Sequence, residues 1–158
     1  MNCISHAETP LGGMLMASDG ESLTGLWFVG QKNFAAGLSP DAIERECAVF
    51  DETRRWLDVY FSGREPDFRP ALSPRGSDFQ HRVWRRMAEI PWGKTVSYGE
   101  IARAIGSAAH PVGGAVAHNP ILLILPCHRV IGADGALTGF DAGIERKLWL
   151  LRHEGCCL

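Results

Sequence analysis

The sequence predicts an α+β protein of two small domains. An N-terminal domain of antiparallel sheet plus helix is expected over residues 1–75, and a mainly helical C-terminal domain over residues 76–158. The length of 158 residues allows one domain or two small ones. Three prolines and a glycine lie in residues 64–76, a composition typical of a linker. The charge also changes there: residues 1–74 carry 6 Lys and Arg against 11 Asp and Glu, whereas residues 75–158 carry 10 against 7.

The composition excludes several classes of protein. With 46% hydrophobic and 22% charged residues, the chain is neither disordered, collagen-like nor a coiled coil. The strongly apolar run at residues 121–126 is far shorter than the roughly 20 residues of a membrane span, and the N-terminus lacks the features of a secretory signal. Five cysteines without a CxxC pair favour a reducing compartment over a disulfide framework. We therefore expect a cytoplasmic protein that does not contact membranes.

The N-terminal elements follow from short apolar runs and turn residues. Residues 2–8, 14–18 and 22–29 are partly apolar runs separated by turn-forming residues, a pattern that predicts an antiparallel meander. Ser39, Pro40 and Asp41 form a helix-start signal of capping hydroxyl, proline and acid. Apolar residues at helical spacing continue to Phe61, and Gly63 predicts the end of this helix.

The C-terminal elements begin with two capping boxes. Ser77-x-x-Gln80 and Ser97-x-x-Glu100 each predict the start of a helix. Gly106 ends the second helix, and a short turn leads to another predicted helix at residues 111–118. Two short helices with a glycine between them have the outline of a helix-turn-helix, although most such pairs are simply packed helices.

The helix at residues 111–118 has almost no side-chain bulk. Gly113 and Gly114 lie in its interior, where each costs about 1 kcal/mol relative to alanine. Either the helix packs closely against a neighbouring helix, or a bulky ligand must lie against its backbone. A DNA minor groove is only about 6 Å wide and normally excludes a helix, but a widened groove could admit one made of glycine and alanine.

The candidate chemistry lies at Cys127 and His128, directly after an apolar run. A free thiol has a pKa near 8.5, so a nucleophilic cysteine needs a base or a positive field. His128 could act as that base through a water, because adjacent side chains on an extended segment point in opposite directions. Glu154, near the end of the last helix, is a candidate carboxylate to orient the base. Taken alone, a Cys-His dipeptide is usually structural.

Several motifs together resemble a known family, the O6-alkylguanine-DNA alkyltransferases. They are Val96-Ser97-Tyr98, Val112-Gly113-Gly114-Ala115, His118-Asn119-Pro120, Pro126-Cys127-His128-Arg129-Val130 and residues 147–155. The resemblance covers residues 77–155 almost continuously and the first 75 residues only in outline. It implies a ribonuclease-H-like N-terminal domain and a winged-helix-like C-terminal domain with a helix-turn-helix.

The resemblance also implies an activity, the direct reversal of DNA alkylation. The protein would flip a damaged guanine, or an O4-alkylthymine, out of double-stranded DNA and move the alkyl group irreversibly to Cys127, once per molecule. His128 would be the base acting through water, oriented by Glu154. Asn119 would hold the turn and the active-site segment together, and Tyr98 would donate its hydroxyl to guanine N3.

The resemblance assigns two further sets of residues. The DNA-binding residues would be Tyr98, Gly99, Ser107, His110, Gly113, Gly114, Ala115 and Arg129. The pocket for the flipped base would be formed by Pro126, Val130, Phe140 and Asp141. No cofactor and no obligate protein partner are implied. Some family members hold zinc in the first domain, but Cys3 and His6 have no second pair of ligands here, so we predict no metal.

The sequence departs from the family pattern at the predicted DNA interface. The arginine that usually fills the gap left by the flipped base falls on His110, the turn at residues 106–109 is about two residues short, and Asp141 adds negative charge near DNA. These changes affect efficiency and lesion range more than the reaction itself. Two alternatives remain open: a non-catalytic relative that binds alkylated DNA, and an unrelated cysteine hydrolase that uses Cys127 and His128.

Overall fold

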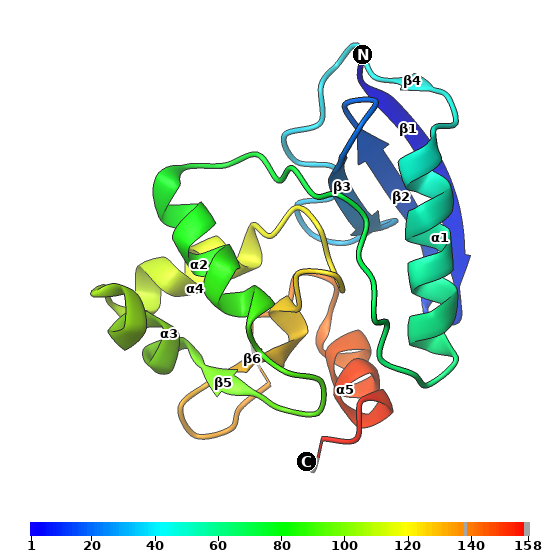
Figure 1. Ribbon diagram of the computed structural model, residues 1–158. Helices are drawn as coiled ribbons and strands as arrows, with labels where there is room; N and C mark the ends of the chain where they lie inside the picture. The colour runs from blue at the N-terminus through cyan, green and yellow to red at the C-terminus, as the bar shows by residue number, and fades with distance from the viewer. Residues whose placement is uncertain (138, 157–158) are drawn as a thin grey trace. The chain divides into compact units, whose positions relative to one another are not determined.

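The computed structural model describes residues 1–137 and 139–156. The chain divides into two compact units, Met1–Arg75 and Gly76–Leu158. Figure 1 shows the first unit as a small sheet with one helix, and the second as a set of short helices with a short two-stranded sheet. No helix among the described residues is long and apolar enough to cross a bilayer.

The first unit is built on a three-stranded meander. Strands β1 (Cys3–Thr9), β2 (Gly12–Ser18) and β3 (Leu23–Phe28) pair antiparallel, as the sequence predicts. Helix α1 (Ala48–Phe61) packs against these strands and lies along the sheet in Figure 1. The core contains several fully buried large side chains, which are Met14, Met16, Leu26, Phe28, Phe50 and Tyr60.

The predicted start of the first helix is wrong. Residues Ile43–Glu44 form a short strand, β4, that pairs parallel to β1, so the sheet is mixed and not wholly antiparallel. Ile43 N donates to the Asn2 carbonyl at 3.0 Å, and α1 begins only after Cys47. The Ser39 hydroxyl bonds to Asp41 in a local turn instead of capping a helix. Pairing with the free edge of β1 outweighs this local helix signal, because tertiary context overrides propensity.

The proline-rich segment at residues 64–76 does more than connect the two units. Leu23 N donates to the Ala71 carbonyl at 2.8 Å, and Ser73 N donates to the Leu23 carbonyl at 2.8 Å. These bonds form an isolated parallel bridge between Leu23 and Leu72. Part of the segment therefore covers the outer edge of β3, which would otherwise expose unpaired backbone groups.

In the part of the second unit that the structure describes there are four α-helices and the short parallel pair of strands β5 (Val96–Ser97) and β6 (Val130–Ile131). The helices are α2 (Asp78–Ala88), α3 (Tyr98–Ile105), α4 (Ala109–Ala117) and α5 (Ile144–His153). Both predicted capping boxes are confirmed, at Ser77 with Gln80 and at Ser97 with Glu100. Helix α4 packs against α2 and α3, and its backbone is tied to α2 where Trp84 Nε1 donates to the Ala115 carbonyl at 2.9 Å.

The turn between α3 and α4 is tight. Gly106 has a φ of 69°, a left-handed conformation that favours glycine, and Ser107 N donates back to the Ala102 carbonyl at 2.8 Å. Helix α4 begins at Ala109, two residues earlier than predicted, so His110 and Pro111 lie in its first turn. A proline is tolerated there because the first amide groups of a helix have no partner within the helix.

Candidate active site

Cys127 begins a single turn of 3-10 helix, Cys127–Arg129, that leads into β6. The extended backbone expected for this segment is therefore wrong. Cys127 N donates to the Leu125 carbonyl at 2.8 Å, and Arg129 N donates to the Pro126 carbonyl at 3.0 Å. Both Cys127 and His128 are buried, with 4% and 0% of their surface exposed. The thiol therefore lies below the protein surface, where a reacting group must enter a pocket to reach it.

Asn119 joins the end of α4 to this segment. Its Nδ2 donates to the Leu125 carbonyl at 2.8 Å, and its Oδ1 accepts from Ile121 N at 3.0 Å. A hydrogen bond from the Asn119 side chain also lowers the pKa of Cys127. The buried amide thus holds the apolar turn closed and contacts the thiol, which is the arrangement that the resemblance implies for this residue.

His128 and Glu154 are brought together, with His128 Nε2 and Glu154 Oε2 2.6 Å apart in the interior. Glu154 caps the C-terminal end of α5, and its other oxygen accepts from Arg129 Nε at 2.7 Å. Burial by itself raises the pKa of Glu154, but the bonds to His128 and Arg129 outweigh it and lower the pKa to about 2. Glu154 is therefore ionised at neutral pH, and His128 Nε2 carries the proton that it donates to the carboxylate.

The second ring nitrogen of His128 is unusual. Nδ1 is the one buried side-chain nitrogen or oxygen among the described residues that has no hydrogen-bond partner. Burial lowers the pKa of His128, so the ring is neutral and Nδ1 is a free proton acceptor. Such atoms are rare in folded proteins and call for a functional or hydration role.

The Cys127 thiol is held protonated in the resting protein. Burial raises its pKa to about 11, while Asn119 and then Lys147 lower it and Asp141 raises it. Its reactivity therefore depends on a base that removes the proton and on a charge that stabilises the thiolate.

Lys147 is a site residue whose role sequence reasoning missed. Its side chain is fully buried on α5, and Nζ donates to the Val130 carbonyl at 2.6 Å. Burial lowers the pKa of Lys147 to about 8. One signal was present in the sequence: Lys147 occupies the same helical stripe as Leu150 and Leu151, and a lysine on a buried apolar stripe is rarely there for packing.

The structure places Arg129 and Ala115, two of the predicted DNA-binding residues, in the interior of the second unit. Arg129 is 9% exposed, and its guanidinium donates to Glu154 and, from Nη1, to the Ile90 carbonyl at 2.7 Å. Ala115 is 4% exposed and lies on the face of α4 that packs against Trp84. Each residue contacts partners that are far away in the sequence: Arg129 bonds to Glu154 and Ile90, and Ala115 bonds to Trp84.

Tyr98 and the residues predicted to form the base pocket lie around Cys127. Burial and then the charge of Cys127 raise the pKa of Tyr98, which is half-buried as the first residue of α3. Gly139, with a φ of 72°, lies so close that an added Cβ would be 3.0 Å from the Tyr98 hydroxyl. Of the predicted pocket residues, Asp141 is half-buried, and three are buried, namely Pro126, Val130 and Phe140.

On the exposed face of α4, the space around the two glycines is not filled by neighbouring side chains. A Cβ added at Gly114 would meet nothing within 4 Å, and one added at Gly113 would meet only Tyr98 Cδ1, at 3.9 Å. Close packing against a neighbouring helix therefore does not explain Gly114. His110 is exposed in the first turn of this helix, and Ser107 and Gly99 are half-buried nearby in the chain.

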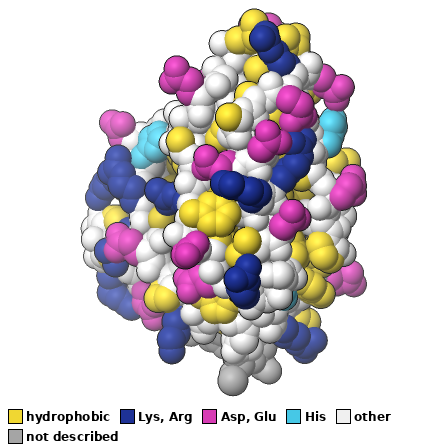
Figure 2. Space-filling model, turned by 45° about the vertical axis from the view of Figure 1, so that its right-hand side comes forward, with side chains coloured by type: hydrophobic (Ala, Val, Ile, Leu, Met, Phe, Trp, Pro, Cys, Tyr) yellow, Lys and Arg dark blue, Asp and Glu magenta, His cyan; other side chains and the backbone are white. Residues whose placement is uncertain are grey.

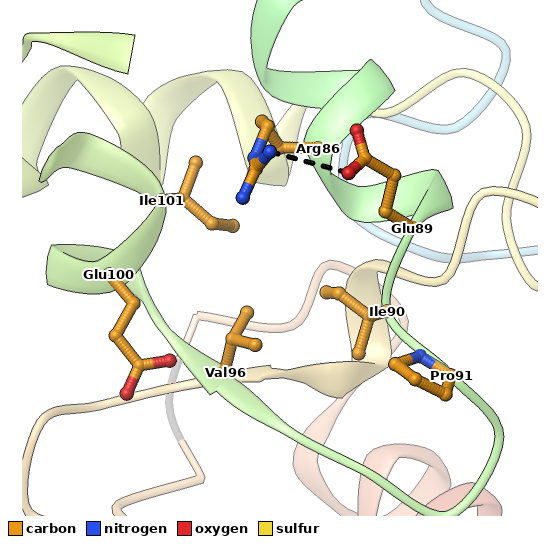
Figure 3. Close-up of a pocket in the computed structure, with 7 residues that line it drawn as sticks. All are labelled: Arg86, Glu89, Ile90, Pro91, Val96, Glu100 and Ile101. Atoms are coloured by element: carbon orange, nitrogen blue, oxygen red, sulfur yellow. Dashed lines mark hydrogen bonds and ion pairs between the residues drawn. The ribbon is translucent and has the colours of Figure 1, made fainter. Parts of the chain in front are cut away.

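A separate pocket of about 220 Å³ lies between α2, β5 and α3 (Figure 3). None of the predicted site residues lines it. It adjoins the site through Ile90, whose carbonyl accepts the bond from Arg129, and through Val96, which pairs with Val130. Its lining residues are Arg86, Glu89, Ile90, Pro91, Val96, Glu100 and Ile101.

Comparison with known proteins identifies the family. Residues 78–156 match the DNA-binding domain, and residues 4–74 the ribonuclease-like domain, of the 6-O-methylguanine DNA methyltransferases. A methylated-DNA–protein-cysteine methyltransferase of Methanosarcina acetivorans is 44% identical over 153 residues, covering 95% of this chain and 96% of the relative. A Mycobacterium tuberculosis protein of the same name is 44% identical over 151 residues, covering 93% and 88%. This chain belongs to the 6-O-methylguanine DNA methyltransferase family.

Solved structures agree with this assignment. The Mycobacterium tuberculosis OGT in complex with DNA has a TM-score of 0.86 and 42% identity, covering 96% of this chain and 92% of that one. The O6-methylguanine-DNA methyltransferase of Pyrococcus kodakaraensis, at 19% identity and a TM-score of 0.56, shares the fold. The predicted α+β fold, a ribonuclease-like domain followed by a DNA-binding domain, is confirmed.

Proposed function

We propose that this protein repairs double-stranded DNA by transferring the O6-alkyl group of guanine to its own Cys127. The observation that carries the proposal is the unpartnered Nδ1 of His128, a buried proton acceptor next along the chain to a buried thiol. The family supports it, since its curated members are named for methyl transfer from DNA to a protein cysteine. We place the reaction in the cytoplasm, where thiols stay reduced.

The proton of Cys127 leaves first. A water between Sγ and His128 Nδ1 passes the proton to the imidazole, and the Glu154 carboxylate stabilises the imidazolium that forms. The positive charge of Lys147 stabilises the thiolate, whose pKa burial alone would keep too high. Base, carboxylate and cation thus act on one sulfur.

The thiolate then attacks the alkyl carbon in line with the bond to O6. A C–S bond forms as the C–O bond breaks, and the electron pair of that bond stays on the guanine. The Tyr98 hydroxyl protonates N3 of the leaving base, and the tyrosinate recovers the proton that His128 took from the thiol. Burial raises the pKa of Tyr98, so the phenol holds its proton until the base becomes anionic. Because the thioether is stable, each molecule reacts once.

The damaged base must be flipped out of the DNA base stack to react. The thiol is only 4% exposed, so a guanine within a duplex cannot reach it, and flipping costs a few kcal/mol that protein contacts must return. The face of α4 at Gly113 and Gly114 fits this role, because these two residues have no side chain to prevent entry into a widened minor groove. His110 in the first turn of α4 would fill the gap in the stack.

The test is incubation with duplex DNA containing O6-methylguanine, followed by intact mass measurement. We expect one adduct of about 14 Da, a methyl group in place of the thiol proton, which Cys127→Ser abolishes. A parallel duplex with O4-methylthymine tests the second predicted lesion. Binding without an adduct would instead indicate a non-catalytic reader of alkylated DNA, and an acyl adduct formed with an ester would indicate a hydrolase.

A further inference from the structure

The predicted DNA-reading segment carries no permanent charge. Residues 104–128, which include the turn after α3, all of α4 and the approach to Cys127, contain no Lys, Arg, Asp or Glu. Binding to DNA depends on cations that neutralise phosphates and release counterions. The face drawn in Figure 2 carries acidic and basic side chains intermixed. The cations must come from neighbours of α4 in the fold.

Three cations of the second unit are already bonded, and a fourth, Arg103, lies along its own helix. Arg129 and Lys147 are buried and bonded within the site. Arg86 pairs with Glu89 at 3.3 Å, and Figure 3 shows its guanidinium directed to that carboxylate. Arg103 folds back along α3, with Nη1 3.7 Å from the position of a Cβ at Gly99.

Arg82 differs from these residues. It is exposed on α2, and its Nη2 donates to the carbonyl of Ile105, the last residue of α3. This bond holds the guanidinium at the turn of residues 106–108 that leads directly into α4. A guanidinium has five N–H donors, so one bond to Ile105 leaves donors for a phosphate oxygen. The anchored side chain also loses less conformational freedom when it binds.

We infer that Arg82 binds a backbone phosphodiester of the DNA that α4 enters, and so supplies positive charge that α4 itself lacks. This inference rests on the proposed function, since it takes α4 as the element in the groove. Arg82 fixes the register of the duplex on the protein and carries no sequence information, as expected of a phosphate contact.

The experiment compares Arg82→Gln with Arg86→Gln by measuring Kd for an undamaged duplex over a range of salt concentrations. Both variants remove one positive charge from α2, so any long-range electrostatic effect on DNA binding is the same in the two proteins. For Arg82→Gln, the slope of log affinity against log salt should become shallower by about 0.9, the value for one lost phosphate contact. For Arg86→Gln, whose charge Glu89 already balances, the slope should stay that of the wild type.

A third variant separates charge from the bond to Ile105. Arg82→Lys keeps the cation and should keep the wild-type slope even if the end of α3 is less stable. The inference is overturned if Arg82→Gln leaves the slope unchanged, if Arg86→Gln lowers it equally, or if Arg82→Lys loses as much slope as Arg82→Gln. Wild-type reaction with free O6-alkylguanine base, which has no phosphate, tests Cys127 separately. Its failure would count against the proposed function, while the salt slopes still decide the role of Arg82.

Discussion

Each of the two units has a network of ion pairs around one arginine, and the two networks differ in burial. In the first unit, Arg54 Nη1 lies 2.8 Å from Glu46 and 3.4 Å from Asp51, and the Glu46 side chain is 60% exposed. In the second unit, Arg129 lies 2.7 Å from Glu154, whose side chain is 0% exposed. Exposed pairs contribute about 0–1 kcal/mol, whereas removing one member of a buried pair costs about 3–5 kcal/mol.

The buried network around Glu154 carries the cost of removing charged groups from water, which the exposed network around Arg54 does not. An apolar cluster of similar volume is often as stable as a buried ion pair, so the network around Glu154 is a poor way to gain stability alone. It does something that the Arg54 network does not: it fixes the tautomer of His128 and leaves Nδ1 without a partner, on the residue next to Cys127 in the chain. We therefore expect the two networks to respond differently to substitution.

The largest effect is expected for Glu154→Gln. The change removes the charge that balances Arg129 and stabilises protonated His128, so unfolding free energy should fall by about 3 kcal/mol. Alkyl transfer should slow by about 100-fold or more, because the base loses its orienting carboxylate. Urea unfolding and the rate of adduct formation measure the two effects. If Glu46→Gln, made as a control, were equally damaging, burial would not be the distinguishing feature.

Lys147→Met should separate stability from chemistry. The pKa of Lys147 is lowered from 10.5 to about 8, so burying the cation costs about 3 kcal/mol of stability at neutral pH. Methionine removes this cost, but it also removes the hydrogen bond to the Val130 carbonyl, which contributes about 1 kcal/mol. The variant should therefore melt at a higher temperature and transfer alkyl groups at least 10-fold more slowly. A variant that is both less stable and fully active would show that Lys147 only supports packing.

Acid should unfold the protein through Glu154. Its pKa is lowered to about 2 in the folded state, so the unfolded chain binds the proton more tightly and stability falls as pH drops from about 4.5 towards 2. The pKa of Glu46 is also lowered to about 2, chiefly by its bonds to Arg54 and Ser5, but this pair is exposed and salt screens it. Added salt should thus remove little of the acid sensitivity, whereas Glu154→Gln should remove much of it.

The smallest effect is expected for Arg54→Gln. Its carboxylate partners remain solvated when the guanidinium is lost, so unfolding free energy should change by no more than about 1 kcal/mol. Alkyl transfer to Cys127 should keep the wild-type rate. A loss of several kcal/mol, measured by urea unfolding, would mean that the bonds of Arg54 to Ser5 and to the His6 carbonyl matter more than their exposure suggests.

The sequence predicts what depends on neighbours along the chain. The capping boxes at Ser77 and Ser97 lie where expected, because a cap involves residues only three positions apart. The start of α1 was misplaced, since pairing of Ile43 with β1 depends on a strand about 40 residues away. The buried bonds of Arg129 and Lys147 could not be predicted for the same reason, because their partners, Ile90 and Val130, meet them only in the folded chain.

The most direct test of the central claim is the stoichiometry of transfer. The protein is mixed with an increasing excess of duplex containing O6-methylguanine, and methyl groups are counted on the peptide that contains Cys127. Methyl transfer should reach a plateau at one methyl group per protein molecule, all of it on Cys127, however much DNA is added. Continued removal of methyl groups beyond one equivalent, or a methyl group on a different residue, would contradict this claim.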